Sequence, residues 1–141
     1  MLLAFALISQ CACNIKRDNP LDPNFDSNIT IPVEVSGVQS DVYGVQEATP
    51  YVNLSWNSNS HHNTDGYIIY RSLGYYSAYA IIATRPHIQG SDRQSYSHSS
   101  ADDPTVAPGD YYYRISAYKD YEAGRLEGRQ SSPHFVRIPS Q

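Results

Sequence analysis

The sequence predicts an all-β domain whose short antiparallel strands pack as a sandwich or a barrel. From residue 31 to residue 139, runs of β-branched and aromatic residues alternate with clusters of turn-forming residues, a spacing typical of these two architectures. The chain has 13 tyrosines against 3 phenylalanines and 1 tryptophan, and tyrosine suits a half-buried sheet. No stretch alternates a strand with a long helical pattern, which argues against a parallel α/β fold.

Seven runs have the length and composition of strands. Each is rich in Val, Ile, Tyr or Ser and is bounded by turn-forming residues. The expected strands span residues 33–38, 51–56, 67–72, 79–84, 94–100, 111–118 and 134–139.

The first four runs are separated by recognisable turns. VEVSGV precedes a loop at 40–50. YVNLSW alternates strictly, so its valine, leucine and tryptophan share one face. The polar loop NSNSHHNTDG leads into YIIYRS, and LGYYSA separates that run from YAIIAT. These boundaries are the turn signals expected between the strands of a sandwich or barrel.

The last three runs follow the same rule. RPHIQGSDR precedes QSYSHSS, and the turn-rich ADDPTVAPGD precedes YYYRISAY. We expect a loop at 119–128, KDYEAGRLEG, before the final run HFVRIP. Within YYYRISAY, alternation places Tyr111, Tyr113, Ile115 and Ala117 on one face, which tapers and is apolar enough to be core. The other face is mixed, as a solvent-exposed face should be.

These motifs together resemble the fibronectin type III domain, an immunoglobulin-like sandwich of seven antiparallel strands. The resemblance rests on LSW, GYIIYRS and PGDYYYRISAY and covers about residues 31–139. It implies that Trp56 is the core tryptophan and that Tyr111 forms the tyrosine corner, in which the hydroxyl bonds back to nearby backbone. The structural core that it implies consists of Trp56, Tyr67, Ile69, Tyr111, Tyr113, Ile115 and Ala117.

The N-terminal residues have the features of a targeting signal. MLLAFALI is too short to span a bilayer but suits the apolar region of a secretory signal. The chain's two cysteines, Cys11 and Cys13, follow this run, and their spacing does not staple a fold. An apolar run followed by small residues and Cys resembles a bacterial lipoprotein signal, which implies a lipid on Cys13 or Cys11. An ordinary signal peptide without lipid is the alternative.

The segment between this signal and the domain has the composition of a linker. Residues 14–30, NIKRDNPLDPNFDSNIT, are polar, include two prolines and show no period of 2 or 3.6. We expect them to be a flexible, disordered segment. The sequence therefore predicts a signal and lipid-attachment region at 1–13, a linker at 14–30 and a domain at 31–139.

Charge and motifs argue against several functions. The net charge of −4 does not favour nucleic acid. His61, His62 and Asp65 could approach a metal, and Asp102 and Asp103 could approach calcium, but neither group supplies enough ligands. The domain has no Gly-x-Ser-x-Gly elbow, no cysteine nucleophile and no phosphate-binding glycine loop. We therefore expect no enzyme activity, no cofactor and no metal.

The tyrosines expected on the outside are the candidate binding surface. Tyr121 is also expected on the outside, and the candidate binding surface consists of Tyr70, Tyr75, Tyr76, Tyr112 and Tyr118. Such side chains are enriched at protein interfaces, could also stack on sugar rings, or could simply pair across neighbouring strands. The last of these is the simplest explanation of their outward positions.

The function that follows is a non-catalytic binding or spacer module. We expect the lipid to hold the module on a membrane outside the cytoplasm, in a bacterial cell envelope. If no lipid is attached, we expect the module to be secreted. Its expected partner is a cell-envelope protein, and the alternative is a polysaccharide held by the exposed tyrosines. The sequence is also compatible with a piece of a larger surface protein.

Overall fold

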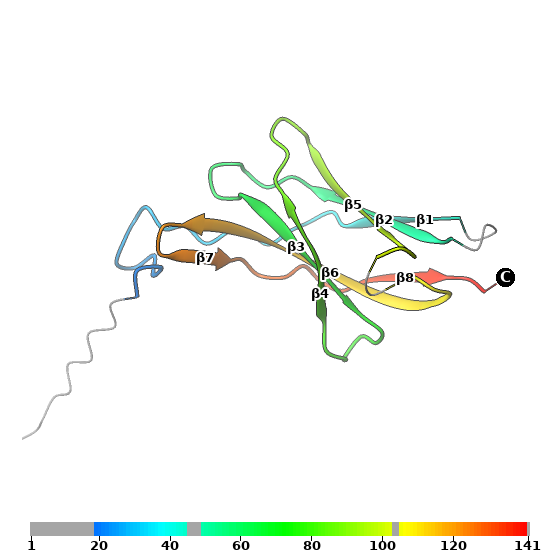
Figure 1. Ribbon diagram of the computed structural model, residues 1–141. Helices are drawn as coiled ribbons and strands as arrows, with labels where there is room; N and C mark the ends of the chain where they lie inside the picture. The colour runs from blue at the N-terminus through cyan, green and yellow to red at the C-terminus, as the bar shows by residue number, and fades with distance from the viewer. Residues whose placement is uncertain (1–18, 45–48, 103–104, 141) are drawn as a thin grey trace, which may run out of the picture.

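The computed structural model describes residues 19–44, 49–102 and 105–140, and every regular element in these ranges is a β-strand. The strands form two antiparallel sheets that face each other as a sandwich (Figure 1). The smaller sheet has the order β1-β2-β5. The larger has the order β4-β3-β6, and both β7 and β8 pair with β6. The strands are β1 (Gln39–Tyr43), β2 (Tyr51–Asn57), β3 (Gly66–Ser72), β4 (Ala80–Pro86), β5 (Arg93–Ser99), β6 (Gly109–Tyr121), β7 (Gly124–Glu127) and β8 (His134–Ile138). The predicted all-β antiparallel sandwich is confirmed.

The core between the sheets comes from alternate residues of the facing strands. The side chains predicted to form it are all buried, namely those of Trp56, Tyr67, Ile69, Tyr111, Tyr113, Ile115 and Ala117. The indole of Trp56 meets the ring of Tyr67 edge-on, with 5.2 Å between the ring centroids. A buried side chain of this size stabilises the fold by at least about 1.5–3 kcal/mol. The alternation of apolar residues along the strands therefore produces the core of the sandwich.

A tyrosine corner fixes the start of β6. The Tyr111 hydroxyl accepts a hydrogen bond from the Ala107 backbone N–H at 3.1 Å and donates one to the Ala107 carbonyl at 2.8 Å. Val106, next to this residue, is buried in the core. One phenol thus closes the loop that leads into the longest strand of the larger sheet.

The first strand lies later than predicted. The expectation of a strand at 33–38 is wrong, because β1 occupies part of the expected loop at 40–50. Val35 still enters the core, but Gly37 takes a left-handed conformation with φ +65° and ends the extended run. β1 then pairs with β2 over five residue pairs.

The expected loop at 119–128 is also wrong. β6 continues to Tyr121 and turns through two residues into β7, which pairs back on β6. Gly124, with φ +138°, supplies the backbone conformation that this tight turn needs. The described residues therefore hold eight strands where the sequence predicts seven.

Residues 128–133, here called the bulged segment, separate β7 from β8. Pro133 has no N–H to give to the ladder, and Ser131 bridges the gap. Its N–H donates to the Ile115 carbonyl at 2.8 Å, and its Oγ accepts from the Ile115 N–H at 3.0 Å. β7 and β8 are thus two halves of one edge that both follow β6 (Figure 1).

Residues 19–30, here called the strap, make regular turns where the composition suggests a structureless linker. The side-chain oxygens of Asn19 and Asp22 each accept from the backbone N–H two residues on, at 3.1 and 2.9 Å. Asp26 does the same at 2.9 Å. These are the local turns that Asn and Asp favour, and they lead to Ile29, which is buried.

The strap is attached to the hairpin of β6 and β7. The Tyr121 hydroxyl accepts from the Thr30 N–H at 2.9 Å and donates to the Thr30 carbonyl at 3.0 Å, so each end of β6 carries a tyrosine that binds both backbone groups of one residue. A Cβ placed on Gly124 would lie 3.6 Å from Leu21 Cδ1. The strap thus packs against the domain, while Cys11, Cys13 and residues 14–18 lie outside the described residues.

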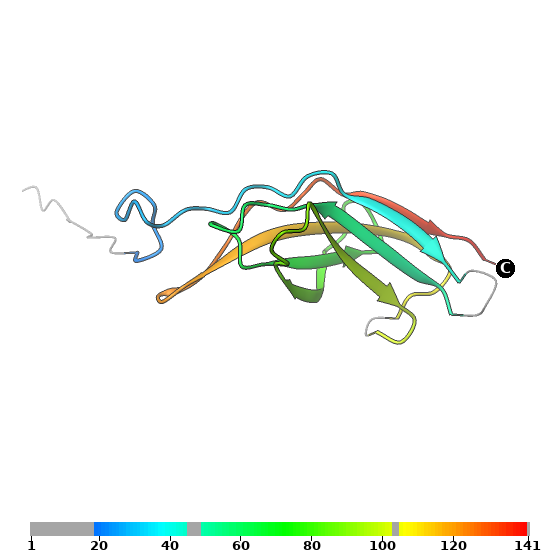
Figure 2. The ribbon, with the colours of Figure 1, turned by 90° about the horizontal axis from the view of Figure 1, so that it is seen from above.

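The described chain starts and finishes at opposite ends of the sandwich. Figures 1 and 2 show the strap at one end, beside the β6–β7 hairpin, and the C-terminal residues beyond β8 at the other. No helix in the described ranges is long and apolar enough to span a bilayer.

Candidate functional site

Two of the five tyrosines proposed for a binding surface are not exposed. Tyr70 and Tyr118 are each only 7% exposed, so the expectation that they are accessible is wrong. They do point to the outer face of the larger sheet, but neighbouring side chains cover them. The Tyr118 ring lies over Gly66 of β3, and the Arg125 guanidinium lies 3.7 Å from its centroid. An arginine placed this way over an aromatic ring is a favourable cover.

Tyr70 takes part in a hydrogen-bonded cluster on the same outer face. Its hydroxyl and that of Ser116 both donate to Glu127 Oε1. Burial raises the pKa of Tyr70, and the hydrogen bond to the Glu127 carboxylate raises the pKa further. Tyr70 also packs with Ile68 and Tyr118 in a small apolar cluster. Because Tyr70 is buried in this cluster, its ring is not accessible to a partner.

The other three tyrosines do lie together, and a phenylalanine extends their group. Tyr75 and Tyr76 lie in the connection between β3 and β4, and they adjoin Tyr112 of β6 and Phe135 of β8. We call these four residues the aromatic strip. Neighbouring ring centroids are 4.7 Å apart for Tyr75 and Tyr76, 5.8 Å for Tyr75 and Tyr112, and 5.3 Å for Tyr112 and Phe135. Three separate parts of the chain therefore build one continuous surface.

The aromatic strip is accessible to a partner. Tyr76 is 95% exposed, Tyr75 48% and Phe135 46%, and Tyr112 is partly buried between them. The guanidinium of Arg137 lies 5.6 Å from the Phe135 ring and pairs with Asp110 at 2.7 Å. Because Arg137 donates to the Asp110 carboxylate, the pKa of Asp110 is lowered. The strip thus has an apolar centre and a charged margin, the arrangement typical of contact surfaces.

Phe135 was not among the residues that sequence reasoning selected. A signal for it was present, because Val136 alternates with it and lies in the core, so Phe135 must face outward. Its position directly opposite Tyr112 in the ladder depends on the register of β6 and β8. That register is set by the bulged segment, which the sequence did not indicate.

The rings of the strip are inclined to one another. Tyr75 is perpendicular to Tyr112, at 90°, and is inclined at 73° to Tyr76. Tyr112 and Phe135 are inclined at 49°. The four rings of the strip therefore do not share one plane.

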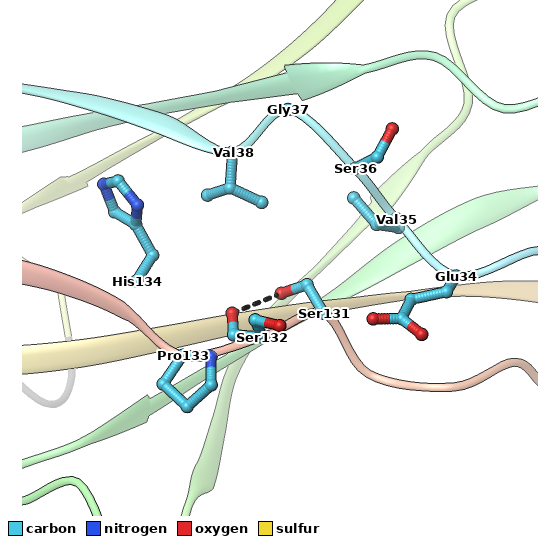
Figure 3. Close-up of a pocket in the computed structure, with 9 residues that line it drawn as sticks. All are labelled: Glu34, Val35, Ser36, Gly37, Val38, Ser131, Ser132, Pro133 and His134. Atoms are coloured by element: carbon cyan, nitrogen blue, oxygen red, sulfur yellow. Dashed lines mark hydrogen bonds between the residues drawn. The ribbon is translucent and has the colours of Figure 1, made fainter.

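A small cavity opens between the residues that precede β1 and the end of the bulged segment with the start of β8. It has a volume of about 310 Å³ and lies between residues 34–38 and 131–134 (Figure 3). His134 lines it and is hydrogen bonded through Nε2 to Ser40 Oγ at 2.9 Å. Burial lowers the pKa of His134. The two walls come from residues nearly the whole domain apart in sequence, so local motifs do not reveal this cavity.

Asp65 and Asp102, two of the side chains considered for metal binding, have other roles, and the rings of His61 and His62 lie against each other with 3.9 Å between their centroids. The Asp65 carboxylate accepts from Lys119 Nζ and from the Asp120 N–H, each at 2.8 Å. Burial opposes the charge on Asp65, but these hydrogen bonds outweigh it and lower the pKa. Asp102 accepts from the Ser99 N–H at 2.6 Å, and Asp103 lies outside the described residues. Within the described ranges, no three potential metal ligands gather at one place.

Comparison with known proteins identifies the fold. No protein-family model and no curated protein matches the chain. The crystal structure of a Fn3-like protein from Clostridium thermocellum matches with a TM-score of 0.53 and 21% identity, over 79% of this chain and 98% of that one. A structure of titin kinase and its flanking domains gives a TM-score of 0.42 and 17% identity over 74% of this chain, and the match spans 17% of that longer chain. The chain has a fibronectin type III-like fold.

Proposed function

We propose that this protein is a non-catalytic module, held outside the cytoplasm by a lipid on Cys13 or Cys11, that binds another protein through the aromatic strip. The fibronectin type III-like fold supports a non-catalytic module. The apolar run and the two cysteines before the strap support the anchor. The lipid would provide attachment that the sandwich itself does not offer.

The observation that carries the binding proposal is the exposure of the strip. Four aromatic side chains from three parts of the chain meet on one surface, and the largest exposed fraction, 95%, belongs to Tyr76. Large aromatic groups left in water favour association, because burying them removes apolar surface from water. They also have few rotatable bonds, so little entropy is lost when a partner fixes them.

The binding experiment is an affinity capture from the cell envelope with matched variants. We expect a protein that is captured by the wild type to be lost with the double variant Tyr76→Ala/Tyr112→Ala. The control is Tyr43→Ala, because Tyr43 is 46% exposed but belongs to β1 of the other sheet. Capture that survives the double variant, or that Tyr43→Ala abolishes equally, would refute the role of the strip.

A polysaccharide screen tests the alternative partner. Retention on insoluble or immobilised polysaccharide that depends on Tyr76 or Tyr112 would replace the protein partner by a glycan. The anchor is tested separately by growth with labelled fatty acid. We expect label on the wild type and none after both Cys11 and Cys13 are changed to Ala.

A further inference from the structure

The guanidinium of Arg114 lies beside the aromatic strip and has no hydrogen-bond acceptor among the described residues. Arg114 follows Tyr112 by two residues on β6, so both side chains point to the outer face of the larger sheet. Its Cζ lies 4.7 Å from the centroid of the Tyr79 ring. Its Nε is buried and makes no hydrogen bond to any described residue. Tyr79 in turn reaches the Tyr75 carbonyl through its hydroxyl, at 3.5 Å.

Most other arginines in the described ranges have polar partners. Arg71 donates to the Thr105 carbonyl, Arg93 to Asn57 and Ser55, and Arg125 and Arg137 pair with aspartates. Arg129 approaches Glu34 at 3.9 Å. Arg85 resembles Arg114 in that it only stacks on a tyrosine, but it is exposed to water. Arg114 is therefore unusual because it is partly buried and still lacks an acceptor in the described structure.

A carboxylate on the same face does not neutralise Arg114. Glu127 accepts hydrogen bonds from Tyr70 and Ser116, and no ion pair joins it to Arg114 in the described structure. Buried polar groups in native proteins are nearly always satisfied, and an exception calls for an explanation. Here the Tyr79 ring lies against the guanidinium. The Nε atom is covered, but Arg114 is only partly buried, so its two terminal nitrogens are the donors that an outside group could reach.

We propose that Arg114 binds a carboxylate of an acidic, partly apolar peptide segment whose apolar side chains lie on the aromatic strip. This inference rests on the proposed protein-binding function and specifies the chemistry of the partner. A guanidinium matches a carboxylate with two parallel hydrogen bonds, which a lysine cannot reproduce. The charge of Arg114 complements the acid, and the inclined rings of the strip complement apolar side chains.

The geometry also sets the spacing in the partner. Arg114 and Tyr112 lie two residues apart on one strand, which places their side chains about 7 Å apart along the sheet. An extended peptide has the same two-residue repeat. The acidic residue and a large apolar residue should therefore be separated by one residue in the bound segment.

The test selects random displayed 12-residue peptides on the full chain and measures binding of the enriched peptides by calorimetry. We expect enrichment of Asp or Glu at two positions from an aromatic or aliphatic residue. Arg114→Gln should weaken binding by roughly 10- to 100-fold, the loss expected for a hydrogen-bonded charge. Arg114→Lys should recover only part of it, and Arg85→Gln, the control stacked arginine, should change binding less than twofold.

The outcomes distinguish a failure of this inference alone from a failure of the proposed function. If Tyr76→Ala weakens binding while Arg114→Gln does not, the strip binds protein but the acidic partner is refuted. If neither variant weakens binding, or no peptide is enriched, both the inference and the binding role of the strip fail. If polygalacturonate binds in an Arg114-dependent way and peptides do not, the occupant is an acidic polysaccharide and the proposal is overturned. Thermal melting of each variant serves as the control for retention of the fold.

Discussion

Removing one oxygen atom at the tyrosine corner should measurably destabilise the domain. In Tyr111→Phe the ring can remain in the core, where Tyr111 is 5% exposed, but both hydrogen bonds to Ala107 are lost. Each such bond contributes about 0.5–1.5 kcal/mol net. The two together give an expected loss of about 2 kcal/mol in the free energy of unfolding. For a domain of this size, that loss corresponds to a decrease of roughly 6–10 °C in Tm.

The matched control is the next residue. Tyr112 lies on the opposite face of β6, and within the described structure its hydroxyl makes no hydrogen bond. Tyr112→Phe should therefore change Tm by less than about 2 °C, as surface substitutions usually do. Urea titration should show a lower midpoint for Tyr111→Phe with an unchanged m-value, because the surface exposed on unfolding is the same. Equal shifts in the two variants would refute the assignment of the corner.

Two further predictions concern packing and pH. A Cβ on Gly66 would lie 2.5 Å from the Tyr118 hydroxyl oxygen and closer still to the Arg85 carbonyl, so Gly66→Ala should cost about 1–3 kcal/mol in a urea titration; a variant as stable as the wild type would show that Tyr118 does not cover this glycine. Burial lowers the pKa of His134 below its usual range, so the unfolded chain binds this proton more readily than the folded one. Its contribution to stability is complete above pH ~6.5 and decreases as the pH falls through the folded pKa. Tm should thus fall between pH 7.5 and pH 5.5, and the fall should be smaller in His134→Gln; an unchanged fall would place the titrating group elsewhere.

Much of the sandwich could be predicted because burial imposes a period of two on each strand. Trp56 and Tyr113 could be assigned to the core since every second neighbour on their strands is also apolar. β1 and β7 were missed for a different reason. Their positions depend on two glycines, Gly37 and Gly124, at which the chain leaves an extended run or turns back. Because glycine adopts both positive and negative φ, the sequence does not show which conformation each one takes.

The candidate surface was only partly predictable because alternation gives the direction of a side chain and not what covers it. Tyr70 and Tyr118 face outward as expected, yet Arg125 and Glu127 of β7 reach over that face. Because β7 was not predicted, the covering of these two tyrosines by its side chains could not be predicted either. Arg114 shows the same limit, because the absence of an acceptor is a property of the three-dimensional surroundings.

If the protein is anchored by a lipid, the strap reduces the distance between the domain and the bilayer. A flexible tether from Cys13 to the start of the predicted domain could reach roughly 60 Å. The described part of the chain begins at Asn19, which is at most about 20 Å of fully stretched chain from that cysteine. With the lipid on Cys13, the β6–β7 hairpin would therefore rest close to the headgroups, and the opposite end of the sandwich would point outward. The hydroxyl of Tyr121, which binds both backbone groups of Thr30, would then help to keep the strap against the hairpin that faces the bilayer.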